Sequence, residues 1–149
     1  MTKACLILPA SGVDLKTVAA LADVMASRGS DTSAPPKFRL CQALAEFRLG
    51  HFEQAVNCAQ PGVNSSSRHS RAHAAAIMAM SQFRLNQVDA ARTTLADCNQ
   101  VIEKLPKLES GDLGDSWRDW IIAHALQSEA KRMIDGEGAS AQPLADSVR

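Results

Sequence analysis

One stretch of the chain occurs twice: residues 43–55 are echoed by residues 79–91, at an offset of 36 positions from Phe47 to Phe83. Both copies carry Phe-Arg-Leu, and the next residue is Gly50 in the first copy and Asn86 in the second. Glycine and asparagine most readily take the left-handed conformation that ends a helix. Small residues on either side of this turn would let two helices approach closely. The repeat therefore predicts helical hairpins that follow one another along the chain.

A repeat period in the thirties with this pattern is typical of tetratricopeptide-like proteins. The predicted helices cover about residues 14–28, 37–49, 51–61, 68–85, 88–104 and 117–134. Residues 2–8 align with the end of a repeat's first helix, which Pro9 stops. We predict an all-α fold: a tetratricopeptide-like right-handed stack of antiparallel helical hairpins with a C-terminal capping helix.

The folded part is expected to be a single helical-repeat domain at residues 1–134. The remaining residues, 135–149, lack apolar periodicity and are expected to form a disordered tail. Asp14 is the expected N-cap of the first complete helix, since its carboxylate can accept hydrogen bonds from free backbone amides. Pro61 is expected to end its helix, because proline cannot continue the hydrogen-bond ladder.

The repeat equivalence starts within a helix, at Lys3, which leaves a hairpin without its first half. We therefore expect the chain to be a fragment or to descend from a longer protein. Helix 14–28 would then have an incompletely covered apolar side. This predicts a homo-oligomer formed through the N-terminal end.

The charge balance argues against two classes of partner. The chain has 16 basic and 16 acidic residues, so its formal net charge is zero and it lacks the basic excess of a nucleic-acid or membrane-surface binder. Hydrophobic residues make up 46% of the chain, yet no apolar run approaches the ~20 residues that a membrane-spanning helix needs. We therefore expect no nucleic-acid partner, no membrane partner and a cytoplasmic location.

The four cysteines are predicted to act by packing. Cys5 and Cys41 are one repeat apart, and the next equivalent position is Ile77. A cysteine that alternates with isoleucine is most simply a small buried hydrophobic residue. Metal or redox chemistry is the alternative, but the chain has no Cys-x-x-Cys pair.

The histidines do not form an evident site either. His69 and His73 are four residues apart and could face one metal, but no further ligand lies nearby, so solvated histidines near a helix N-terminus are favoured. His124 is expected to be a partly buried structural residue rather than a general base, because no nucleophile motif accompanies it. No catalytic, cofactor-binding or metal-binding residue is predicted, and the chain is not expected to be an enzyme.

Arg48 and Arg84 occupy equivalent positions and are candidate partner-binding residues. Each precedes an acidic residue by five positions, Glu53 and Asp89 respectively. One interpretation places the two guanidinium groups on one side, as a ladder for acidic peptide groups. The favoured interpretation pairs each arginine with the acid across its own hairpin turn, where the helix dipole also stabilises the carboxylate.

Trp117 and Trp120 are the only tryptophans and the remaining candidate partner-binding residues. Their three-residue spacing places them on adjacent parts of one helix face. Packing of the last helix onto the preceding one is the favoured interpretation. Exposed aromatic anchors for a partner are the alternative.

Four segments carry a resemblance to a known family: residues 3–9, 11–15, 45–50 and 110–123. They resemble the tetratricopeptide-like C-terminal region of large bacterial serine/threonine protein kinases. The similarity spans about residues 3–134, and its more specific parts are the Leu-Pro of the first segment and the Trp-x-Asp-Trp of the last. It implies a helical-repeat interaction module without catalytic residues. The chain has no kinase lysine, catalytic loop or Mg²⁺-binding motif, so kinase activity is not carried over.

These observations favour a non-catalytic protein–protein interaction or scaffolding module that presents a concave surface to a peptide or another protein. No cofactor is expected. The alternative is a structural domain that mediates self-association or spacing and has no groove ligand.

Overall fold

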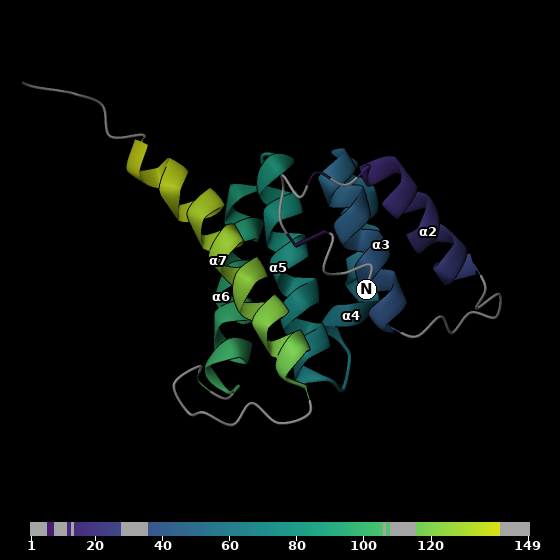
Figure 1. The fold of residues 1–149 in the computed structure, drawn as a ribbon. Helices are drawn as coiled ribbons and strands as arrows, with labels where there is room; N and C mark the ends of the chain where they lie inside the picture. The colour runs from purple at the N-terminus through teal and green to yellow at the C-terminus, as the bar shows by residue number, and fades with distance from the viewer. Residues whose placement is uncertain are drawn as a thin grey trace, which may run out of the picture.

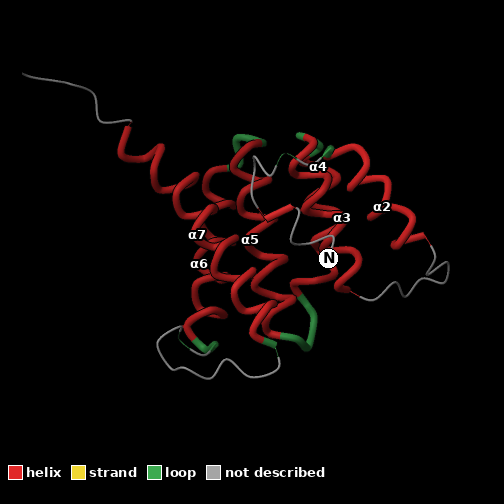
Figure 2. Tube along the Cα trace, in the orientation of Figure 1, coloured by secondary structure: helices red, strands yellow, loops and turns green. Residues whose placement is uncertain are grey.

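The computed structural model describes residues 6–7, 12, 14–27, 36–105, 107 and 116–140. Every regular element within these residues is helical, which confirms the predicted all-α class (Figures 1 and 2). The described helices are α2 (Leu15–Ser27), α3 (Pro36–Leu49), α4 (Phe52–Val63), α5 (Arg68–Arg84), α6 (Val88–Glu103) and α7 (Trp117–Ser140). Their starts agree with the predicted ones to within about one residue.

The central helix is α5, which contacts α3, α4, α6 and α7. In Figure 1, α6 and α7 lie on one side of it, and α3 and then α2 lie on the other. A helix enclosed on several sides needs apolar residues all round, and residues 72–81 of α5 are all buried, most of them alanine or methionine. The buried hydroxyl of Ser81 is satisfied by donating to the Ile77 carbonyl at 2.8 Å.

The two hairpin turns have the same hydrogen bonds. At the first, the His51 amide donates to the Glu46 carbonyl at 2.9 Å and the Gly50 amide donates to the Phe47 carbonyl at 3.1 Å. This pair of bonds is a Schellman motif, with Gly50 at a φ of 85°. The second turn repeats both bonds 36 positions later, at 2.9 and 3.0 Å, around Asn86 with a φ of 61°. The predicted left-handed turn residues are confirmed.

The expected end of α4 at Pro61 is wrong, because the helix continues through Val63. The reason is the packing of Gly62, which is buried between neighbouring helices. A Cβ at this position would lie 2.8 Å from the Ala74 Cβ and 2.9 Å from the Leu40 Cδ2. This close approach of α3 and α5 holds the last turn of α4 in place although proline removes one hydrogen bond.

The helix α2 begins as predicted. The Asp14 carboxylate accepts from the Lys16 amide at 3.1 Å and from the Thr17 hydroxyl at 2.6 Å. These hydrogen bonds, with the one from the hydroxyl contributing most, hold the pKa of Asp14 below its usual value. Asp14 therefore caps α2 in its ionised form.

One face of α2 packs inward and another stays open. Val18, Ala19 and Ala22 are buried against the core. Leu21 and Val24, which share a different face of the helix, are 51% and 47% exposed. The expectation that the apolar side of this helix is incompletely covered does not hold for Val18, Ala19 and Ala22, which are buried; the exposed apolar residues belong to the other face.

The last helix packs on both α5 and α6. Its buried apolar residues recur at helical spacing: Trp120, Ala123, Leu126, Ala130 and Ile134. On the same side, the Gln127 amide donates to the Asn99 side-chain carbonyl of α6 at 2.6 Å. Figure 1 shows the C-terminal turns of α7 extending away from the other helices.

The predicted tail begins too early, since α7 continues through Ser140. Glycines at positions 136 and 138 lower helix propensity by about 1 kcal/mol each, but they keep the backbone amide that a proline would remove. Residues 141–149 lie outside the described part, as do residues 29–35 and 108–115. Of the predicted segment 2–8, Leu6 and Ile7 are described; both are helical, and Leu6 is fully buried.

Candidate interaction surface at the hairpin turns

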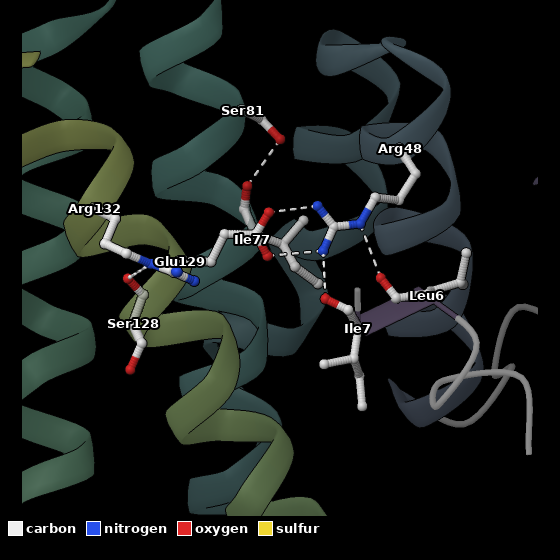
Figure 3. Close-up of polar contacts among 8 residues, drawn as sticks. All are labelled: Leu6, Ile7, Arg48, Ile77, Ser81, Ser128, Glu129 and Arg132. Carbon is white, nitrogen blue, oxygen red and sulfur yellow. Dashed lines mark hydrogen bonds and ion pairs between the residues drawn. The ribbon is translucent and has the colours of Figure 1, made fainter. Parts of the chain in front are cut away.

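Arg48 is the most connected polar side chain near the first turn (Figure 3). Its Nη1 and Nη2 atoms donate to the two carboxylate oxygens of Glu129 at 2.5 and 2.8 Å. Its Nε donates to the Leu6 carbonyl and its Nη2 to the Ile7 carbonyl, both at 2.8 Å. We call this group of four residues the Arg48 clasp. It joins the N-terminal segment, α3 and α7.

The clasp excludes most solvent, since the side chains of Arg48 and Glu129 are 5% and 14% exposed. A planar guanidinium that meets a carboxylate through two parallel bonds is the strongest form of ion pair in proteins. The expected pair between Arg48 and Glu53 is therefore wrong. The guanidinium binds Glu129 of α7 and the backbone carbonyls of Leu6 and Ile7 instead, whereas Glu53 is exposed at the start of α4.

Arg84, the repeat equivalent of Arg48, is the last residue of α5 and is exposed. Its Cζ is 5.4 Å from the ring centroid of Phe52, at the start of α4. Such a cation–π contact is worth about 0.5–1 kcal/mol at an exposed site. Among the described side chains no ion pair links Arg84 with Asp89, so this expected pair is wrong too. The stacking on Phe52 takes its place.

A cavity of about 390 Å³ lies between the first turn, the end of α5 and α7. Its apolar lining includes Leu49, Phe52 and Met133, and its polar lining includes Arg84 and the Arg48–Glu129 pair. A second hollow of about 490 Å³ adjoins Phe52 and the first turn from the side of α4. Because the clasp pair neutralises itself, Arg84 supplies the uncompensated charge of the cavity. We call this cavity the Arg84 pocket.

The two tryptophans have different environments. Trp120 is fully buried, and its ring centroid is 4.1 Å from that of His124. Trp117 is 46% exposed beside Ile121, which is 42% exposed, and the Arg118 guanidinium lies 5.2 Å from its ring. The packing interpretation is thus confirmed for Trp120, whereas Trp117 remains a candidate aromatic anchor for a partner.

His73 and His124 are both at least partly buried. His73 was expected to be solvated, but it is 2% exposed, and its Nε2 donates to the Asp119 backbone carbonyl at 2.8 Å. The prediction was wrong because α7 covers this turn of α5. Burial lowers the pKa of His124, and the positive charge of Lys131 acts in the same direction. The predicted partial burial of His124 is confirmed.

The cysteine interpretation agrees with the structure where it can be compared. Cys41 and Cys98 are buried, and Cys58 is half-buried. Burial raises the pKa of Cys98 to about 12, so its thiol stays protonated and unreactive. Cys5 lies outside the described residues. In the part of the chain that the structure describes, no three metal-ligating side chains gather in one place.

Comparisons with protein-family models, characterised proteins and solved structures find no match for this chain. None of the helices in the described ranges combines the length and apolarity needed to cross a membrane. Sequence reasoning brought Arg48 and Arg84 forward but missed Glu129, which lies 81 residues beyond Arg48 and outside the repeats. No local pattern marks such a distant partner.

Proposed function

We propose that the chain is a tetratricopeptide-like right-handed stack of hairpins that serves as a protein-interaction module. Two features support this arrangement. The hairpins α3–α4 and α5–α6 share one turn geometry, and α5 contacts both helices of the preceding hairpin, as α7 contacts both helices of α5–α6. The resemblance of residues 3–134 to kinase C-terminal regions further supports a role accessory to a bacterial serine/threonine kinase signalling protein.

The observation that carries the proposal is the Arg84 pocket. It offers an uncompensated guanidinium next to the apolar side chains of Leu49, Phe52 and Met133. A carboxylate beside an apolar side chain on a partner peptide would satisfy both features at once. The preferred partner is therefore a peptide with an acidic residue next to a large apolar one.

A peptide-display selection on the purified chain tests this partner chemistry. We expect the wild type to enrich peptides in which an acidic residue neighbours an apolar one. The Arg84→Gln variant should lose this enrichment, because it removes the charge while keeping a long polar side chain. Arg92→Gln is the matched control, since Arg92 is an exposed arginine of α6 that does not line the pocket.

Two results would contradict the proposal. One is the absence of any enriched peptide class. The other is an enriched class whose affinity, measured by fluorescence anisotropy, falls equally in the Arg84→Gln and Arg92→Gln variants. The second result would mean that net charge, rather than the pocket, attracts the peptides.

A second candidate function is self-association through α2, which rests on the exposure of Leu21 and Val24. Neighbouring exposed apolar side chains of this size mark interaction surfaces. Multi-angle light scattering across a concentration series tests it. We expect a dimer at high concentration that Leu21→Lys disrupts and Ala90→Lys preserves, because Ala90 is exposed on α6, which does not contact α2. A monomer at all concentrations would exclude this function.

A further inference from the structure

A cationic cavity lies at the other end of α5 from the Arg84 pocket. It has a volume of about 310 Å³ and is formed by the end of α4, the first turns of α5 and the C-terminal half of α6. Its polar lining comprises Arg68, Arg71, Asp97, Gln100 and Lys104. Arg71 and Arg84 are 13 positions apart on α5, or about 20 Å along the helix axis. The two cavities are therefore separate sites.

The cations of this cavity are not neutralised. Within the described ranges, no ion pair joins Arg68, Arg71 or Lys104 to an acidic group. The Nε atom of Arg71 is buried and has no hydrogen-bond partner in the described structure. A buried charged donor without an acceptor is unfavourable. This atom has no access to solvent, so the groups that a ligand in the cavity could reach directly include the exposed Arg68 and Lys104.

The position of the arginines along α5 is also unfavourable by itself. Arg68 is the first residue of the helix, Arg71 lies one turn later, and the first turn contains no acidic residue. Cations near a helix N-terminus are repelled by the positive end of the dipole, where an acid would be stabilised. Departures from local rules without a compensating structural gain are expected at functional sites. An anion would be attracted by the arginines and by the N-terminal end of α5, whereas the C-terminal ends of α4 and α6, which also border the cavity, oppose it.

We propose that this cavity binds a phosphate monoester. Three cations and one acid, Asp97, give the lining a formal charge of 3 − 1 = +2, which matches the charge of about −1.5 to −2 on a phosphate monoester at neutral pH. Guanidinium groups bind phosphate oxygens through paired hydrogen bonds, and Gln100 adds an amide donor. The volume is at the small end of ligand pockets and fits a phosphate with a short carrier.

Calorimetric titration at low ionic strength tests the site with three probes: inorganic phosphate, O-phosphoserine and acetate. We expect saturable binding of one phosphate probe or both, and at least tenfold weaker binding of acetate. Binding of O-phosphoserine would identify a phosphorylated side chain as an accessible source of the ligand. Binding of inorganic phosphate alone would identify a free phosphate site. In both cases the cavity recognises phosphate chemistry.

Variants separate this cavity from general surface charge. Arg71→Gln and Lys104→Gln should each weaken phosphate binding about tenfold, and Asp97→Asn should strengthen it severalfold, because it removes the one repelling charge. Arg92→Gln is the control and should leave the affinity unchanged. The unfolding temperature of each variant is measured alongside, and the exposed Lys104 provides the test if Arg71→Gln does not fold.

Three results would overturn the proposal. They are the absence of saturable phosphate binding, equal affinity for acetate and phosphate, and equal losses in the Lys104→Gln and Arg92→Gln variants. Because Arg84 and its pocket take no part in this site, failure here leaves the peptide proposal untouched, and the reverse also holds.

Discussion

The two hairpin turns contain the same Phe-Arg-Leu sequence and the same backbone hydrogen bonds, yet their arginines differ completely. Arg48 is enclosed in a four-residue clasp with Glu129, whereas Arg84 lies exposed over the ring of Phe52. The first turn is covered by α7 and the N-terminal segment, whereas among the described residues no such clasp forms at the second turn. A repeat therefore determines its own backbone turn, while neighbouring elements decide what each repeated side chain does.

The largest expected difference comes from truncating the two arginines. Arg48→Met should lower the free energy of unfolding by ~3–5 kcal/mol, because it leaves Glu129 buried and uncompensated. Arg84→Met should lower it by at most ~1 kcal/mol, the size of an exposed cation–π contact. Urea unfolding followed by circular dichroism measures both. Equal losses of unfolding free energy in the two variants would contradict the different roles assigned to Arg48 and Arg84.

The tryptophans of α7 test whether the helix that covers the first turn is anchored as described. Trp120→Ala should cost ~3–5 kcal/mol, as expected for a large aromatic side chain lost from a core. Trp117→Ala should change stability by less than ~0.5 kcal/mol, since surface substitutions have small effects. Thermal denaturation of the two variants provides the measurement. A large loss in Trp117→Ala would show that the exposed ring also holds the fold.

Gly62 and Cys98 are 36 positions apart and so compare the second helices of the two hairpins. Both are buried against α5: a Cβ at Gly62 would overlap Ala74, and the Cys98 thiol lies 3.5 Å from the Ala72 carbonyl. Gly62→Ala should cost ~1–3 kcal/mol through overpacking. Cys98→Ala should cost about 1 kcal/mol through a small cavity. Chemical denaturation of both variants would refute the packing account if Gly62→Ala proved neutral.

Substitutions of the left-handed residues of the two turns should have the smallest effects on stability. Gly50→Ala should cost about 1–2 kcal/mol, because a Cβ is disfavoured at positive φ. Asn86→Gly should change stability by only a few tenths of a kcal/mol, since both residues accept this conformation. Melting temperatures measured side by side would reveal the asymmetry. A neutral Gly50→Ala variant would contradict the Schellman geometry of the first turn.

Local features of the fold were predictable from the sequence. The helix starts, the Asp14 cap and the left-handed Gly50 and Asn86 follow from short-range chemistry that the repeat makes visible. The helix ends were less predictable, because tertiary contacts override weak stop signals. The tight packing of Gly62 keeps the residues after Pro61 helical in α4. The helix α7 continues through Gly136 and Gly138.

The candidate sites depended on contacts between distant segments, and there the sequence was a poor guide. Repetition of an acid five residues after each arginine suggested local pairs, yet Arg48 binds Glu129 of α7. His73 carried no sign that α7 would cover it. The predicted hairpin brings the start of α5 beside the end of α6, but the sequence did not indicate that Arg68, Arg71 and Lys104 would line one cavity. The position of a residue in the repeat predicts its backbone conformation, whereas the partner of its side chain depends on which other helices pack beside it.

The most direct test of this account is a pair of double-mutant cycles, one on Arg48 and Glu129 and the other on Arg84 and Asp89. Urea unfolding of the single and double variants (Arg→Met, Glu→Gln, Asp→Asn) gives each coupling energy. We predict a coupling of about 2–3 kcal/mol for the clasp pair and nearly zero for Arg84 with Asp89. Equal couplings, or a coupling confined to Arg84 and Asp89, would contradict the claim that neighbouring elements decide the fate of the repeated arginines.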